Sequence, residues 1–144
     1  MRFALFCDDS LAKPIVDALG SRIDGHQLSH AVRVTPQSDA LLHGQTSVSF
    51  VEHWEDLLVA KDVDAVIVGG SDQMILDGTK QLAAAGIPIL FVPRAAQGST
   101  FAYELSLIRD DNNVSLWPLF WHRFDSAVMR LKQAIQAGAL GKVQ

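Results

Sequence analysis

The chain has 144 residues, a formal net charge of −4, 49% hydrophobic residues and a single cysteine. This length suits one domain with its own core. The negative charge, without any basic run, argues against a nucleic-acid-binding surface. No apolar run approaches the roughly 18 residues that span a bilayer, and no signal peptide is recognisable. One cysteine excludes an internal disulfide, so we expect a cytoplasmic protein without a membrane partner.

The chain begins with an apolar run, residues 3–6, which predicts a buried strand. Ser10 or Asp9 can cap the helix that follows. Because proline is tolerated only in the first turn of a helix, Pro14 places the helix start near residue 11 or 12. The sequence therefore opens with a strand, a polar turn and a helix.

The next segment is less regular. We expect the first helix to end at Gly20, and residues 25–34 to form a weaker second strand. A turn is predicted at residues 36–39, and residues 47–51 alternate as in a short strand. Residues 54–59 then predict a brief helix.

Residues 62–94 carry the clearest pattern in the chain. Residues 65–68 are continuously apolar and rich in β-branched side chains, as in a strand buried on both faces. The break that follows contains Ser71 and Asp72, either of which can cap the next helix, and a second apolar run spans residues 87–92. Strand, helix and strand joined by short loops indicate a right-handed crossover, and hence a parallel sheet.

The last third of the chain adds a helix at residues 99–110, a strand at residues 114–120 and a helix at residues 125–137. Pro118 suggests that the strand lies at an edge of the sheet. The last helix has apolar residues at helical spacing. The alternation predicts a doubly wound, mostly parallel, three-layer α/β fold of the Rossmann type. Ligands of such sheets bind beyond the carboxyl ends of the strands, where residues 69–73 and 92–97 form loops.

Several passages resemble a known family. They are Asp62-Val63-Asp64-Ala65-Val66-Ile67-Val68, Ala84-Ala85-Gly86, the Pro93 loop, and His122-Arg123-Phe124-Asp125 leading into Gly138-Ala139-Leu140-Gly141-Lys142-Val143. With these, nearly the whole chain resembles the N-terminal domain of the glucose-fructose oxidoreductase and inositol dehydrogenase family (Gfo/Idh/MocA). The resemblance implies NAD or NADP as cofactor, and hydride transfer to or from a sugar-like alcohol or aldehyde.

The family also has a second domain, which covers the cofactor and supplies most of the substrate site. Here the chain stops at Gln144. We therefore expect residues 1–144 to be a single Rossmann-like nucleotide-binding domain, without the second domain of the family.

The glycine-rich turn of the family falls between the first strand and the first helix. Its three glycines correspond here to Cys7, Asp9 and Ala12, and the carboxylates of Asp8 and Asp9 bring negative charge to the place of the phosphates. The resemblance implies that the cofactor-binding residues of this turn are Cys7, Asp8, Asp9, Ser10 and Leu11.

Two further cofactor positions follow from the resemblance. The acidic ribose-binding residue of the family falls near Arg33, where an arginine could meet a 2′-phosphate and favour NADP; an exposed arginine at a strand end is the alternative. The loop that lies along the cofactor corresponds to Gly69, Gly70, Ser71 and Asp72. Two glycines permit close approach of a ligand, and simple turn chemistry is the alternative.

The catalytic motif of the family is degenerate in this chain. Its Glu-Lys-Pro reads Phe91-Val92-Pro93 here, so Val92 replaces the lysine that contacts cofactor and substrate. Arg94 is adjacent, but its guanidinium stays protonated and cannot act as a general base. We assign no catalytic residue, and keep Val92 and Pro93 as cofactor contacts. Whether the chain is an enzyme stays open; alone, we expect it to be catalytically incompetent.

The alternative hypothesis is a non-enzymatic binding or assembly module that has kept the fold and lost the dinucleotide. Trp117 and Trp121, near the predicted edge strand, then mark a homo-oligomer interface, with core packing as the alternative.

Metal and thiol chemistry find little support. Asp8 and Asp9 also resemble the magnesium-binding pair of receiver domains, but the further aspartate and lysine of those domains are not cleanly matched. The five histidines show no metal-ligand spacing, although His122 could face the active-site edge. Cys7 precedes a helix, which lowers a thiol pKa, but the two neighbouring aspartates oppose that shift and favour an inert thiol.

Overall fold

Six parallel strands form the centre of the structure, a computed structural model that describes residues 1–22, 25–34, 48–70, 72–93, 98–120 and 125–139. In sheet order the strands are β3-β2-β1-β4-β5-β6, and each pairs with its neighbours in parallel. Their bounds are β1 (Arg2–Cys7), β2 (Gln27–Val32), β3 (Ser49–Val51), β4 (Ala65–Gly69), β5 (Ile89–Val92) and β6 (Leu116–Pro118). The predicted doubly wound α/β fold is confirmed.

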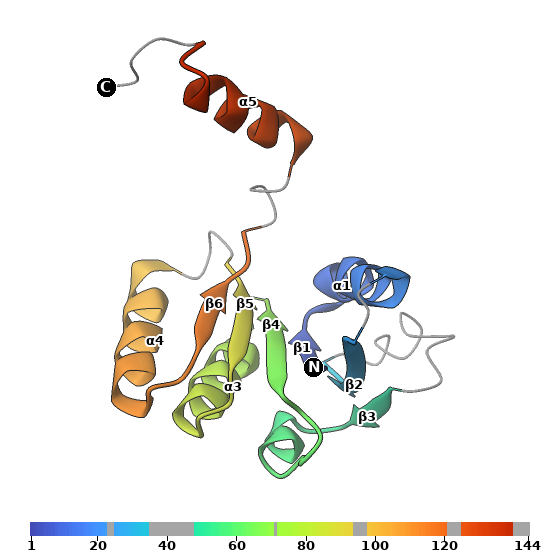
Figure 1. The fold of residues 1–144 in the computed structure, drawn as a ribbon. Helices are drawn as coiled ribbons and strands as arrows, with labels where there is room; N and C mark the ends of the chain where they lie inside the picture. Colours follow the sequence, from blue (N-terminus) through green and yellow to red (C-terminus); the bar gives the residue numbers. More distant parts are fainter. Residues whose placement is uncertain (23–24, 35–47, 71, 94–97, 121–124, 140–144) are drawn as a thin grey trace.

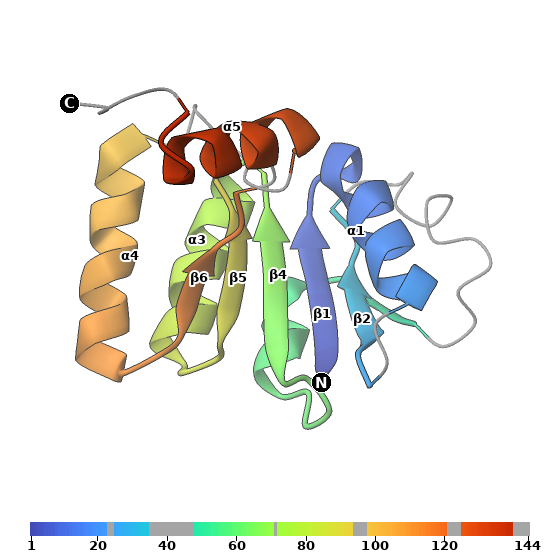
Figure 2. The same ribbon diagram turned by 45° about the horizontal axis from the view of Figure 1, so that its top comes forward.

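The strands alternate with four α-helices and one 3₁₀ helix in the described part of the chain. They are α1 (Asp9–Arg22), the 3₁₀ helix η1 (Trp54–Leu58), α3 (Gln73–Ala84), α4 (Gly98–Asn112) and α5 (Ser126–Gln136). Helices α3 and α4 lie side by side on one face of the sheet, and α1 lies on the other face over the β1–β2 half (Figures 1 and 2). Helix α5 lies beyond the carboxyl ends of the strands (Figure 1).

The central strands are buried on both faces. In β1, Ala4 and Phe6 point to the cluster under α3, while Phe3, Leu5 and Cys7 point to the cluster under α1. Successive side chains of a strand point to opposite faces, so a strand covered on both sides must be apolar throughout. The continuous apolar runs in the sequence have this cause.

Helix α1 differs from its predicted bounds. It begins at Asp9 and ends at Arg22, whereas the sequence suggested a start near residue 11 and an end at Gly20. The carbonyl of Asp8 accepts the backbone N–H groups of Leu11 (3.0 Å) and Ala12 (3.2 Å), which closes the first turn earlier than expected. Pro14 therefore lies in the second turn, where its missing N–H gives up one intrahelical bond.

The remaining elements agree with the predictions in type and order. Strands β2, β3, β5 and β6 are shorter than predicted, and β6 ends the sheet at one edge, as Pro118 suggested. Asp72 caps α3 through a bond from the Met74 N–H (2.8 Å), and Asp125 caps α5 through a bond from the Ala127 N–H (2.8 Å). The turn expected at residues 36–39 lies outside the described part of the chain.

Candidate functional site

The candidate site lies where the carboxyl ends of β1 and β4 meet. Cys7 pairs with Gly69 across these strands, and the N–H of Asp8 donates to the carbonyl of Gly69 at 2.9 Å. From here the chain leaves β1 toward β2 on one side and leaves β4 toward β5 on the other. This reversal is the switch point at which open α/β sheets bind ligands. The structure thus brings the turn after β1 next to the end of β4.

The carboxylate of Asp8 lies at this switch point, the expected ligand crevice of such a sheet. Its Oδ1 accepts a hydrogen bond from the Ser10 hydroxyl at 2.6 Å. Its Oδ2 lies next to the turn after β4, because a Cβ placed on Gly70 would be only 3.2 Å from that oxygen. Negative charge therefore stands at the point where a pyrophosphate would approach the β1 and β4 turns.

Gly69, the last residue of β4, and Gly70, which follows it, both lie close to neighbouring side chains. A Cβ on Gly69 would lie 2.5 Å from Cδ1 of Leu11 and 3.3 Å from Cβ of Val92. Gly70 has φ of +147°, and a Cβ there would lie 2.6 Å from Cδ1 of Ile75. The φ of Gly70 thus favours glycine without any ligand, and Leu11 and Val92 pack closely against Gly69.

The N-terminus of α3 also faces the crevice. The side chain of Asp72 accepts from the Met74 N–H, and its carbonyl accepts from the Leu76 N–H at 3.0 Å. A carboxylate at this position offsets the positive end of the helix dipole. Asp72 therefore supplies, from within the chain, negative charge and a hydrogen-bond acceptor that a bound phosphate would otherwise supply.

The other predicted residues of the crevice are less accessible. Cys7 is 4% exposed and packs in the cluster under α1, and Val92 is also buried, while Pro93 is half-buried. Burial of Cys7 agrees with the inert thiol of the sequence interpretation. Ser71, Arg94 and the side chain of Asp9 lie outside the described part of the structure, as do Trp121 and His122.

Arg33 lies just after β2, on the far side of β1 from β4. Its N–H donates to the carbonyl of Val51 at 2.9 Å, and its guanidinium carbon is 5.2 Å from the centre of the Phe50 ring. The guanidinium also forms an ion pair with Glu52. A 2′-phosphate at Arg33 would therefore compete with a carboxylate that already neutralises the cation.

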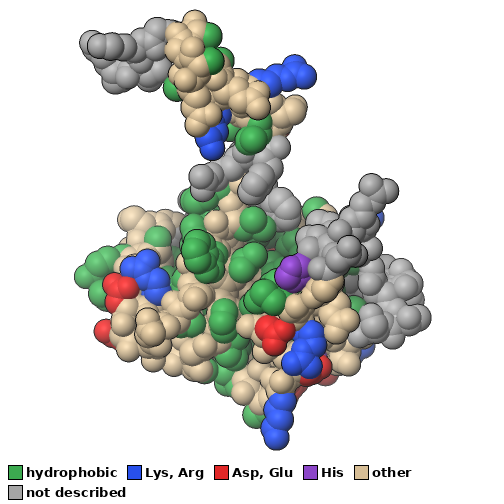
Figure 3. All heavy atoms as spheres, in the orientation of Figure 1, with side chains coloured by type: hydrophobic (Ala, Val, Ile, Leu, Met, Phe, Trp, Pro, Cys, Tyr) green, Lys and Arg blue, Asp and Glu red, His purple; other side chains and the backbone are tan. Residues whose placement is uncertain are grey.

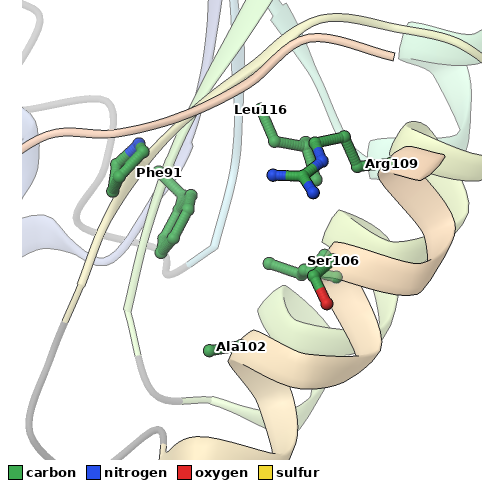
Figure 4. A pocket seen from close by; sticks show the side chains of 7 residues that line it. Phe91, Ala102, Ser106, Arg109 and Leu116 are labelled. Carbon is green, nitrogen blue, oxygen red and sulfur yellow. The ribbon is translucent and has the colours of Figure 1, made fainter. Parts of the chain in front are cut away.

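A second hollow, which the sequence did not predict, lies between α4 and the strands β5 and β6 (Figure 4). It is an open cavity of about 160 Å³, lined by Phe91, Ala102, Leu105, Ser106, Arg109, Leu116 and Pro118. The guanidinium of Arg109 is paired with Asp110 (2.7 Å). The walls are mainly apolar, and the hollow lies on the α4 side of the sheet, away from the β1–β4 turns.

The described residues contain neither a membrane-spanning helix nor a metal-binding cluster. None of the described helices is both long and apolar enough to cross a membrane. Within the same residues, no group of three or more His, Cys, Asp or Glu side chains is arranged to hold a metal ion.

Comparison with known proteins shows the fold. No protein-family model matches this sequence, and no curated protein sequence matches it. Solved structures do match. A protein of Sinorhizobium meliloti 1021 assigned as a myo-inositol dehydrogenase shares 23% identity at a TM-score of 0.83, over 100% of this chain and 43% of that one.

Two further structures contain a cofactor. The WlbA dehydrogenase of Bordetella pertussis, in complex with NADH and UDP-GlcNAcA, shares 18% identity (TM-score 0.82) over 99% of this chain and 41% of its own. The scyllo-inositol dehydrogenase of Lactobacillus casei, with bound NAD(H) and scyllo-inositol, shares 18% identity (TM-score 0.83) over 99% and 42%. The chain thus spans about two fifths of these dehydrogenases, and the predicted resemblance is confirmed as a likeness of fold.

Proposed function

We propose that residues 1–144 are a Rossmann-like NAD(P)-binding domain of an oxidoreductase-like protein, which binds the dinucleotide weakly and does not catalyse hydride transfer alone. The observation that carries this proposal is the β1–β4 switch point of a β3-β2-β1-β4-β5-β6 sheet, the place where such sheets are expected to bind ligands. The same fold occurs in dehydrogenases whose structures contain NADH or NAD(H). The cofactor-contacting residues in this proposal are those of the β1, β2, β4 and β5 turns named above.

We expect weak binding because the Asp8 carboxylate and the Leu11 side chain lie where the dinucleotide would approach. A dinucleotide would bring two negative phosphates toward the β1 turn, where the Asp8 carboxylate stands against Gly70. Two unit charges 4 Å apart repel by about 4 kcal/mol at an effective dielectric constant of 20, so even partial exposure to this field would cost a large part of the binding free energy. Leu11 also fills the space above Gly69, which keeps a ligand from the backbone.

The absence of turnover follows from Val92. This side chain is hydrocarbon and only 3% exposed, so it can neither take nor give a proton. In the family that the sequence resembles, a lysine at this place takes part in proton transfer. An oxidoreductase containing this domain would need its acid or base, and most of its substrate contacts, from elsewhere.

Calorimetric titration with NADH and NADPH tests this proposal. We expect one-to-one binding with a Kd near 1 mM, which corresponds to about −4.1 kcal/mol. The Asp8→Asn variant keeps an acceptor for the Ser10 hydroxyl but removes the charge, so we expect about tenfold tighter binding, or about 1.4 kcal/mol. A preference for NADPH would assign Arg33 as the contact of the 2′-phosphate.

Asp77→Asn is the matched control. Asp77 is an exposed carboxylate on α3, bonded to the side-chain amide of Gln73 at 2.9 Å, and its loss changes the net charge equally without touching the crevice. Its affinity should equal that of the wild type. If neither the wild type nor Asp8→Asn binds either dinucleotide at millimolar concentration, the cofactor proposal is wrong.

The second candidate function is a non-enzymatic binding or assembly module. It is favoured by the occupied crevice and by Trp117, which is 65% exposed on the edge strand β6. An exposed tryptophan on an edge strand is common at subunit interfaces. A homo-oligomer formed at this edge would be a function of the fold that needs no cofactor. We favour this candidate if the titrations detect no binding of NADH or NADPH.

A further inference from the structure

Helix α5 has an apolar stripe that the described residues of its own chain leave exposed. Val128, Leu131 and Ile135 recur at the spacing of one helix face, and no residue of α5 is buried. Leu131 is 53% exposed. An isolated helix of 11 residues is shorter than the roughly 12–15 residues needed for marginal stability in water. This stripe therefore needs an apolar surface to pack against.

The sheet offers such a surface on the α1 side of β5 and β6. Leu90 and Trp117 are register partners, so their side chains point to the same face, and Leu90 packs at the rim of the cluster under α1. Helix α1 lies over β1 and β2, and no helix of the described chain lies over this part of the sheet (Figures 1 and 2). Figure 3 shows apolar side chains gathered on this face, between α4 and α1. We call this surface the β5–β6 face.

The charges of the two parts are complementary. Residues 1–120 contain 15 acidic and 8 basic side chains, a formal charge of −7, whereas residues 121–144 contain one acidic and four basic side chains, a formal charge of +3. Helix α5 itself has no acidic side chain; Lys132 borders its apolar stripe, and Arg130 adds a second positive charge to the helix. A helix of this kind is attracted to an acidic body with an apolar surface.

We propose that two copies of this chain form a dimer in which α5 of each copy packs on the β5–β6 face of the other. A second copy fits because α5 projects beyond the carboxyl ends of its own strands and buries no residue there (Figure 1). A two-fold arrangement covers both unpartnered surfaces of both chains at once. Each helix-on-sheet contact then occurs twice, so two modest contacts together hold one dimer. This surface is separate from the crevice, so the dimer does not depend on cofactor binding.

Site-specific cross-linking tests directly whether α5 of one copy packs on the β5–β6 face of the other. In a Cys7→Ala background, Trp117→Cys and Leu131→Cys place one thiol on each proposed surface, and both side chains are exposed, so the fold should survive. A short bis-maleimide should then link the thiols into a covalent dimer. The control pair Trp117→Cys with Gln133→Cys uses an exposed residue on the opposite side of α5 and should give little dimer.

Each other outcome overturns the proposal. A link within one chain, seen by mass spectrometry as a cross-linked monomer, would mean that α5 folds back on its own sheet. No link from a chain that sediments as a monomer would mean that both surfaces stay open or bind a different protein. No link from a chain that sediments as a dimer would place the interface elsewhere.

Sedimentation of single variants provides an independent readout. Leu131→Asp puts a charge in the centre of the stripe and should raise the dimer Kd by at least tenfold. Gln133→Asp adds the same charge on the opposite side of α5 and should change the Kd by less than about threefold. Equal effects of the two substitutions would show that the stripe is not the contact surface.

Discussion

Asp8 sets both the backbone connections and the charge at the β1–β4 switch point. Its backbone joins β1 to β4 through the bond to Gly69, and its carbonyl starts α1 by accepting from Leu11 and Ala12. Its carboxylate then stands against Gly70. One residue therefore connects two strands and a helix, and it also sets the sign of the potential where a phosphate would bind. A substitution here must preserve the backbone contacts to report on charge alone, as Asn does.

Asp64 links the start of β1 to the segment before β4. Its Oδ2 accepts the N–H of Arg2 at 2.6 Å, and the Arg2 guanidinium lies 3.7 Å from Oδ1. The backbone hydrogen bond from Arg2, helped by the charge of the same residue, lowers the pKa of Asp64 below its ordinary value of 3.8. A carboxylate with a depressed pKa in the folded state stabilises the fold above its unfolded pKa.

The Asp64→Asn variant should therefore be slightly less stable than the wild type at neutral pH. That difference should shrink as the pH falls below about 3.8, because the wild-type carboxylate also becomes protonated. Urea unfolding of both proteins between pH 7 and pH 2.5 measures it. A difference that stays constant over this range would show that the charge of Asp64 does not contribute.

At the scale of elements, α3 lies unusually close to the sheet. A Cβ on Gly78 would lie 2.6 Å from Cε1 of Phe6 and 3.0 Å from Cδ2 of Trp54. The helix can approach β1 and η1 only because position 78 has no side chain. Phe6 and Trp54 belong to the main cluster on this face of the sheet, so the contact lies at the centre of the core.

The Gly78→Ala variant is expected to be destabilised by about 1–3 kcal/mol, because overpacking must move an aromatic ring or the helix. The intrinsic helix propensity predicts the opposite sign, a gain of about 1 kcal/mol for alanine. Chemical denaturation distinguishes the two, and Gln81→Ala on the exposed side of α3 should change stability by less than about 0.5 kcal/mol. A stabilised Gly78→Ala protein would show that the core yields easily at this point.

Helices α3 and α5 illustrate a further contrast between elements. Both α3 and α5 have an aspartate N-cap and apolar residues at helical spacing. Helix α3 buries Ile75, Leu82 and Ala83 against the sheet, whereas α5 buries nothing. The same local pattern thus forms a core helix in one place and an unpartnered helix in the other.

At the scale of the whole molecule, charge is unevenly distributed, with −7 on residues 1–120 and +3 on residues 121–144. If α5 packs on the acidic body of a second copy, part of the association is electrostatic. The screening length falls from about 10 Å at 0.1 M salt to about 3 Å at 1 M. We therefore expect the dimer Kd to rise several-fold between 0.1 M and 1 M NaCl, measured by sedimentation.

The variant with both Arg130→Gln and Lys132→Gln provides the control for this effect. It keeps the apolar stripe but loses the two cations of α5, so its dimer should be weaker at low salt and nearly insensitive to added salt. Association that strengthens with salt in the wild type would indicate a purely apolar contact, and would remove charge complementarity as an explanation.

Much of the fold could be predicted because it depends on local pattern. Residues 65–68 are continuously apolar and rich in β-branched side chains, which favours a strand buried on both faces, and either Ser71 or Asp72 could cap the next helix; in the structure Asp72 does so. Helix α1 starts at Asp9, two residues before the position that Pro14 indicates, because the carbonyl of Asp8 closes the first turn while its N–H is bonded to Gly69. The site residues themselves remain proposals, although Cys7, Asp8, Gly69, Gly70 and Val92 do lie together.

The sequence by itself therefore determined the kind and order of the elements, the parallel sheet and the likeness to a cofactor-binding domain, because periodicity, caps and turns act over a few residues. Only the tertiary structure decided that Leu11 packs over Gly69, that Asp8 faces Gly70, and that the described residues leave the stripe of α5 and the face around Trp117 uncovered. These features depend on which distant segments meet, and no pattern of neighbouring residues encodes the distance between them.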